Sequence, residues 1–317
     1  MYYPEPEQRQ HISLSSFAYN IIESDNYAFT GSRTNRSGFI NRIFIECYEG
    51  ATPLKDAPHK EHSFKIRPSN EVTRLLYELD GTKIGRECLF PTKAALFNAI
   101  LESYAKKSQY AREGIYYSET IAALENALLV SPKERRILKI DYLTAEGVRI
   151  TCAVKPYKLV SDSTPTFHYL VGYSRKLSPD EQTDYRPFPF RVSRILGIKP
   201  YSRSHGSGNL TKNEQKKLQL DLDTKGVQFM LGSIEQFEVL LTPSGFNTYR
   251  STTQIRPIAD ESKTRFEGEN IILTFYSTRR QISHYFFKFG KDAIVISPKD
   301  LAQEFYQGYV YAASNYY

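Results

Sequence analysis

A chain of 317 residues is long enough for two or three domains, and its 40% hydrophobic and 24% charged residues are typical of globular proteins. The net charge of +7 favours polyanionic partners, while three scattered cysteines without C-x-x-C spacing argue against a disulfide framework or a zinc site. The sequence begins without an apolar signal region and has no run of about 18 apolar residues, which predicts a cytoplasmic protein with no membrane partner.

Residues 1–110 predict two strand–helix–helix units in succession. The expected elements are a strand over 10–14, a helix capped by Ser15 or Ser16, a helix capped by Ser37, a strand over 63–67, a helix over 68–79 and a helix capped by Thr92. Residues 39–43 align with residues 96–100, since the two segments share a central Asn and a closing Ile. The alternative is that short strand-and-helix patterns recur by chance in a mixed domain.

The strand–helix–helix order resembles the ribbon-helix-helix DNA-binding family, and the second helix, around Ile40 and Ile43, carries most of the resemblance. One such unit cannot bury its apolar face alone, so the two units are expected to pair within the chain. In this family the outward side chains of the strands enter the DNA major groove. The DNA-binding candidates are His11, Ser13, Lys65 and Arg67. Only the last two are well suited to this role, so the alternative is a module that serves as a scaffold.

The rest of the chain predicts a connecting helix, a β-rich domain, a linker and a final mixed domain. The expected boundaries are 111–130 for the helix, stopped by Ser131-Pro132, 131–201 for the β-rich domain, 202–231 for the linker and 232–317 for the last domain. Strand-like runs cover residues 137–143, 149–160, 167–173 and 188–198, which is typical of a small β-barrel. The last domain combines three strands with two helices, so the fold class is α+β.

Four blocks of the β-rich domain resemble the WYL family: residues 138–142, 154–160, 168–173 and 190–195. The tripeptide that gives the family its name is here His168-Tyr169-Leu170, and residues 289–301 resemble the extension that often follows WYL domains. The resemblance implies an Sm-like small barrel that binds a nucleic acid or nucleotide through basic and aromatic residues. It also implies a dimeric regulator with a DNA-binding N-terminal module and a C-terminal dimerisation domain.

Charge and aromatic content point independently to nucleic-acid binding by the same domain. Residues 131–200 hold 13 Lys and Arg against 7 Asp and Glu, which is nearly all of the net positive charge of the chain. Cations attract phosphates, and exposed rings stack on bases. The candidate residues are Tyr142, Lys155, His168, Tyr169, Tyr173, Arg191 and Arg194. Each has a simpler alternative as a core or solvated side chain, and a bend is needed for Arg191 and Arg194 to reach one ligand.

The final segment predicts a homodimer interface, because it contains six aromatic residues that are unfavourable in water. They are Phe305, Tyr306, Tyr309, Tyr311, Tyr316 and Tyr317. Catalysis is not expected, since none of the common nucleotide-binding, hydrolase or metalloprotease motifs occurs. His59 and His62 are better explained by a polar turn than by a metal site, so no cofactor and no metal is expected.

Three functions remain open. The domain order resembles accessory proteins of RNA-targeting type VI CRISPR systems, which raise the activity of an RNA-guided effector nuclease. This resemblance implies a non-catalytic protein that binds single-stranded RNA and acts in antiviral defence. The second hypothesis is a transcription regulator that binds operator DNA through residues 9–105 and senses a ligand in the barrel. The third is a scaffold that binds only proteins.

Overall fold

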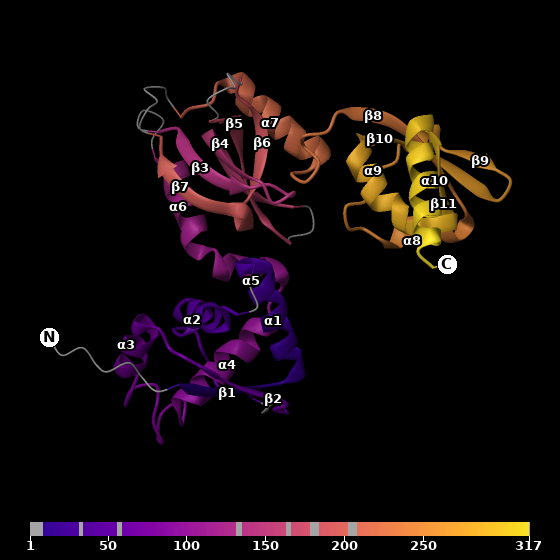
Figure 1. Cartoon of the computed structure of the whole chain (residues 1–317). Coiled ribbons are helices and arrows are strands. Elements are labelled where there is room, and N and C mark those ends of the chain that lie inside the picture. Colours follow the sequence, from indigo (N-terminus) through magenta and orange to yellow (C-terminus); the bar gives the residue numbers. More distant parts are fainter. Residues whose placement is uncertain are drawn as a thin grey trace. The chain divides into compact units, whose positions relative to one another are not determined.

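The computed structural model describes residues 9–31, 34–55, 59–130, 135–162, 166–177, 184–201 and 208–316. The chain forms two compact units, one made of Met1–Asn126 with Thr166–His168 and the other of Ala127–Pro165 with Tyr169–Tyr317. Both combine helices with antiparallel strands, which confirms the predicted α+β class (Figure 1).

The first unit contains the predicted strand–helix–helix order twice. Its elements are β1 (Gln10–Leu14), α1 (Ser16–Thr30), α2 (Arg36–Cys47), β2 (His62–Ile66), α3 (Asn70–Glu78), α4 (Lys93–Ala105), α5 (Gln109–Tyr116) and the start of α6 (Ser118–Leu129). The Ser15 and Thr92 side chains cap α1 and α4 as predicted. The predicted cap at Ser37 is wrong, because Asn35 is the N-cap and the Ser37 hydroxyl accepts a hydrogen bond from the Arg67 N–H.

The single helix predicted over 111–130 is also wrong. α5 ends at Tyr116 and a separate helix, α6, begins at Ser118. The predicted stop at Ser131-Pro132 lies outside the described residues.

β1 and β2 form a two-stranded antiparallel ribbon, with His11 opposite Lys65. Two buried asparagines on α2 and α4 bind the ribbon. The Asn98 Oδ1 accepts a hydrogen bond from the Ser13 N–H at 3.1 Å, and the Asn41 Nδ2 donates one to the Arg67 carbonyl oxygen at 3.0 Å. These are the two asparagines that align in the sequence. The match is what an internal repeat would produce, because the asparagine of each strand–helix–helix repeat binds the strand region of the other repeat.

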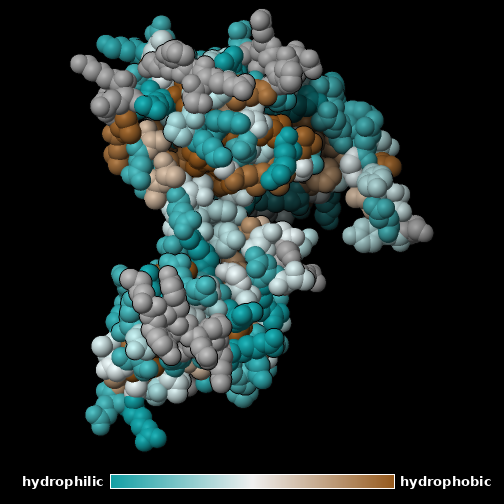
Figure 2. Space-filling model, turned by 60° about the vertical axis from the view of Figure 1, so that its left-hand side comes forward, coloured by the Kyte–Doolittle hydropathy of each residue, from teal (hydrophilic) through white to brown (hydrophobic). Residues whose placement is uncertain are grey.

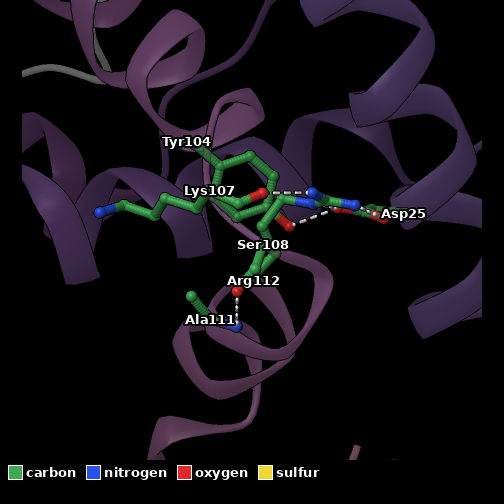
Figure 3. Close-up of polar contacts among 6 residues, drawn as sticks. All are labelled: Asp25, Tyr104, Lys107, Ser108, Ala111 and Arg112. Carbon is green, nitrogen blue, oxygen red and sulfur yellow. Dashed lines mark hydrogen bonds and ion pairs between the residues drawn. The ribbon is translucent and has the colours of Figure 1, made fainter. Parts of the chain in front are cut away.

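A buried ion pair attaches α5 to the rest of the first unit (Figure 3). The Asp25 carboxylate, on α1, accepts from the Arg112 Nε at 2.6 Å and from the Tyr104 hydroxyl at 2.9 Å. The Arg112 Nη1 also donates to the Lys107 carbonyl oxygen at 2.6 Å. Burial, followed by the nearby Asp25 charge, raises the pKa of Tyr104 far above its ordinary value, so this hydroxyl remains a donor.

The second unit contains a five-stranded antiparallel sheet in the order β6-β5-β4-β3-β7. Its strands are β3 (Leu138–Leu143), β4 (Arg149–Ser161), β5 (His168–Lys176), β6 (Arg186–Arg191) and β7 (Ile195–Pro200). The strand-like run predicted over 188–198 forms two strands, joined by the 3-10 turn η1 (Val192–Arg194). In the pairings of the described residues β6 and β7 are edge strands, so these pairings do not close the predicted barrel. The Sm-like layout stays a prediction.

Part of the predicted linker is the helix α7 (Lys212–Lys225), which begins with a capping box between Thr211 and Glu214. Leu218 of α7 is fully buried in a core cluster with Val171 and Tyr173 of β5. Alternate side chains of a strand point to opposite faces. α7 therefore covers the face of the sheet that carries the odd-numbered side chains of β5.

The end of the second unit has a four-stranded antiparallel sheet in the order β11-β8-β10-β9. The elements are β8 (Ile234–Leu241), α8 (Pro243–Ser251), η2 (Glu261–Lys263), β9 (Arg265–Glu267), β10 (Asn270–Thr278), α9 (Arg279–Phe286), η3 (Phe287–Asp292), β11 (Ala293–Ser297) and α10 (Lys299–Ser314). Phe237 of β8, Phe286 of α9 and Leu301 of α10 share one core cluster. The three predicted strands and two predicted helices all occur here.

Candidate nucleic-acid interface

The first candidate surface is the outward face of the β1–β2 ribbon. Ile12 and Leu14 are fully buried, whereas His11, Lys65 and Arg67 are exposed. Ser13 is half-buried, and its hydroxyl is 2.9 Å from that of Ser63. The structure brings the four predicted DNA-binding residues together on this face, with His11 directly opposite Lys65. Arg9, which is also exposed, continues the same alternation and was missed because it precedes the strand.

Two of the predicted base-stacking tyrosines belong to the core of the central sheet. Tyr142 is 4% exposed, its hydroxyl accepts from the Arg191 N–H at 3.3 Å, and its ring lies edge-on to Phe190. Tyr173 is 7% exposed and packs in the cluster beneath α7. Burial, with the nearby Glu214 and Asp221 charges, raises the pKa of Tyr173. The stacking role predicted for both residues is therefore corrected, because neither ring offers a face to a base.

His168 is held by α5. The Glu113 Oε2 accepts from the His168 backbone N–H at 2.8 Å and lies 3.2 Å from the His168 Nδ1. The His168 ring stacks on Tyr110 with 3.8 Å between ring centroids. Tyr110, Glu113 and His168 all belong to the first unit, and the Glu113 side chain is fully buried. These contacts hold the His168 ring, whose side chain is 15% exposed, and a role for His168 as a ligand contact stays a prediction.

Tyr169 and Arg191 lie opposite each other in the β5–β6 register, and both are half-buried. Tyr169 packs against the core cluster beneath α7. Arg194 is half-buried in η1, which supplies the bend that the sequence required between the two arginines. These three predicted residues keep partial access to solvent and remain candidates.

Lys155 belongs to a small basic and aromatic cluster that the sequence did not identify. Its Nζ lies 4.8 Å from the centroid of the Tyr185 ring, and the Arg175 guanidinium lies 5.4 Å from the same centroid. The Glu214 carboxylate is 4.0 Å from Lys155, but it also accepts the capping bond from the Thr211 N–H at 2.6 Å. Two cations therefore share one ring, and only Lys155 is shown beside a carboxylate, which leaves a net positive site suited to a phosphate.

The sequence contained only part of the information that identifies this cluster. Arg175 lies two residues beyond Tyr173 and so shares its strand face, which the alternation alone indicates. Tyr185 directly precedes β6, and its proximity to Lys155 depends on the pairing of distant strands. We name Lys155, Arg175 and Tyr185 the cation–ring cluster.

The part of the chain with most of the positive charge also exposes apolar side chains. Figure 2 shows brown apolar side chains at the surface of the part that holds the central sheet. The exposed large apolar residues of this part include Leu129, Val148 and Leu196. Apolar surface beside cations suits a ligand that has both phosphates and bases.

Within the described ranges, no group of three or more His, Cys, Asp and Glu side chains lies close enough together to hold a metal ion. His62 stacks on Tyr19 with 4.2 Å between ring centroids, which gives this histidine a packing role. Of the helices that the structure describes, none is long and apolar enough to cross a membrane.

Comparisons with known proteins agree with the WYL resemblance. Residues 119–200 match the model of the WYL domain family. No curated protein matches the chain. Among solved structures, one described as the crystal structure of a CRISPR Cas-related protein has a TM-score of 0.73 and 22% identity, over 99% of this chain and 95% of that chain. The proteasome accessory factor B/C (PafBC) of Arthrobacter aurescens has a TM-score of 0.27 and 13% identity, over 96% and 50% of the two chains. The chain therefore contains a WYL domain and shares its fold with a CRISPR Cas-related protein.

Proposed function

We propose that this protein is a non-catalytic regulator that binds single-stranded RNA through its WYL domain and stimulates an RNA-guided effector nuclease. The WYL domain and the CRISPR-related structural neighbour support a regulatory or accessory role. The observation that carries RNA binding is the cation–ring cluster, in which Lys155 and Arg175 flank Tyr185.

A single strand fits this site better than a duplex. Unpaired nucleotides expose both a phosphate and the face of a base, and a protein that offers cations beside rings binds both. Lys155 and Arg175 lie on the sheet itself, where the strands hold them at a fixed spacing. Tyr169, Arg191 and Arg194 extend the proposed interface.

Fluorescence anisotropy with matched single-stranded RNA, single-stranded DNA and duplex DNA, repeated over a salt series, tests the proposal. Single-stranded RNA should bind most tightly, and its affinity should fall steeply with salt. Lys155→Ala should flatten the slope of log affinity against log salt by about 0.7, the contribution of one phosphate contact on a single strand. Lys158→Ala, an exposed lysine on the same strand, is the matched control. Equal or tighter binding to duplex DNA would contradict the proposal.

Stimulation of a nuclease is tested separately. Adding the protein to an RNA-guided, RNA-cleaving effector should raise its cleavage rate, and Lys155→Ala should reduce this effect in proportion to the lost RNA affinity. An unchanged cleavage rate with the intact protein would remove the accessory role while leaving RNA binding in place.

The exposed ribbon supports a second candidate function, the binding of operator DNA. We propose that the first unit is a ribbon-helix-helix pair within one chain, supported by the β1–β2 pairing and the two matching asparagines. If the ribbon reads DNA, Lys65→Ala and Arg67→Ala should weaken duplex binding and leave single-stranded RNA binding unchanged. Arg74→Ala, on the exposed side of α3, is the control.

A further inference from the structure

A second candidate site lies on the other face of the central sheet. A pocket of about 310 Å³ is lined by residues of β4, β5 and β6 that include Ile150, Cys152, Ser174, Lys176, Arg186 and Phe188. Ser174 and Lys176 alternate along β5 with Tyr173, which faces α7. The pocket therefore lies on the face opposite to the one that α7 covers.

The floor and one wall of the pocket are apolar. Cys152 is buried, and burial raises the pKa of its thiol to about 11, so the floor is uncharged. Phe188 lies edge-on to Tyr142, with 5.9 Å between ring centroids, and at 4.7 Å from Phe190. The buried Tyr142 thus supports the Phe188 ring from behind and fixes its orientation.

The rim carries positive charge. Arg186 lies opposite Ser174 in the β5–β6 register, and both Arg186 and Lys176 are exposed. In the part of the chain that the structure describes, neither cation forms an ion pair. Asp184 also lines the pocket, but two cations beside one carboxylate still leave the rim positive. The pocket therefore combines an apolar floor, an aromatic wall and a cationic rim.

We propose that this pocket holds one nucleotide of the bound strand, with its base against Phe188 and its phosphate on Lys176 and Arg186. The inference rests on the proposed binding of nucleic acid by the WYL domain and adds a site that shares Arg175 with the cation–ring cluster. A base needs an apolar slot with an aromatic face, and its phosphate needs cations at the slot's edge. A pocket of this size accepts a small ligand, and a free nucleotide presents the same chemistry as one in a strand.

The absence of tryptophan from the chain permits a direct test. Phe188→Trp places the single tryptophan of the chain in the pocket, and a base stacked on it should quench the tryptophan emission. Phe266→Trp, on β9 in the C-terminal sheet, is the control, because Phe266 is exposed and lies outside the pocket. Single-stranded RNA should quench the first variant and not the second. Quenching by RNA supports a nucleotide in a strand, whereas quenching by adenosine monophosphate without quenching by RNA overturns it.

Charge variants provide a readout that does not depend on the fluorophore. Lys176→Ala and Arg186→Ala should each weaken RNA binding about tenfold and flatten the salt slope by about 0.7. Lys199→Ala, an exposed lysine of β7 outside the pocket, should bind like the parent. One outcome is that anisotropy detects RNA binding while the Phe188→Trp emission is not quenched and the salt slopes of Lys176→Ala and Arg186→Ala match that of the parent. In that case the pocket proposal is wrong and the proposed function stands. If neither the parent protein nor any variant binds single-stranded RNA, the pocket proposal and the proposed function both fail.

Discussion

At the scale of single residues, buried charge in the first unit is compensated at short range. The Asp25 carboxylate accepts hydrogen bonds from three donor atoms, two on Arg112 and one on Tyr104. Removing a buried partner leaves the other charge without compensation, which costs far more than the loss of a surface pair. The same residues attach α5 to α1, so a local change should affect the whole first unit.

We expect Asp25→Asn to lower the free energy of unfolding by on the order of 3 kcal/mol, because Arg112 would remain buried without a counter-charge. Glu78→Gln is the matched control, since Glu78 pairs with Arg74 on an exposed helix face and should contribute less than about 1 kcal/mol. Urea denaturation followed by circular dichroism measures both. Equal effects of the two variants would show that the Asp25 pair is not structural.

Cys152 should resist alkylation in the folded protein. Burial raises the pKa of its thiol to about 11, although the nearby Lys176 opposes this shift. At pH 8 only on the order of one thiol in a thousand is then the reactive thiolate. Mass spectrometry after iodoacetamide treatment should find Cys152 unlabelled until urea unfolds the chain. Rapid labelling of Cys152 in the folded protein would contradict the described burial.

At the scale of elements, α7 packs against one face of the central sheet. The helix buries Leu218 against Val171 and Tyr173 and exposes Leu220 to solvent. The tyrosines that the sequence favoured as ligand contacts lie largely on this covered face. The pocket with Lys176 and Arg186 lies on the opposite face.

The packing of α7 can be tested with two equivalent substitutions on the same helix. Leu218→Ala should destabilise the second unit by about 2–5 kcal/mol, because it removes buried methyl groups and leaves a cavity. Leu220→Ala should change stability by less than about 0.5 kcal/mol, since this side chain is 62% exposed. Thermal unfolding compares the two variants. A Leu220→Ala effect as large as that of Leu218→Ala would mean that α7 packs differently.

At the scale of the whole molecule, α10 combines two roles along one helix. Phe305 is buried in the C-terminal core, and Tyr309 stacks on Phe287 and donates to its carbonyl oxygen at 2.9 Å. Tyr306 and Tyr311 are 64% and 73% exposed. Tyr317 lies outside the described residues. Among the described residues, the predicted dimer contact therefore falls to the exposed tyrosines, because Phe305 and Tyr309 already pack within their own domain.

We expect the protein to be a homodimer, and Tyr306→Ser with Tyr311→Ser should convert it to a monomer in light scattering. Removing the whole segment after Ser297 is a poor test, because it would also remove Leu301 and Phe305 from the core. Tyr77→Ser, an exposed tyrosine of α3, is the control and should remain dimeric. A dimer that survives the double substitution would move the interface away from α10.

Most of the helices and strands follow from local patterns in the sequence. Hydrophobic periodicity and capping residues depend on neighbours within a few positions, so β1, the Ser15 and Thr92 caps and the strands of the WYL domain were predictable. The aligned Asn41 and Asn98 also indicated the repeat before their contacts were known. Local patterns misplaced the α2 cap and missed the break after α5, where tertiary contacts compete with local preference.

Which of the predicted residues are accessible to solvent depends on tertiary contacts. Alternation assigns residues to two faces of a strand but does not say which face another element covers. The covering helix α7 begins 36 residues after the end of β5, and the Glu113 carboxylate that holds His168 lies 55 residues earlier. Such contacts depend on how distant segments meet, so tyrosines that suit both a core and a base-stacking site could be assigned only from the packed structure.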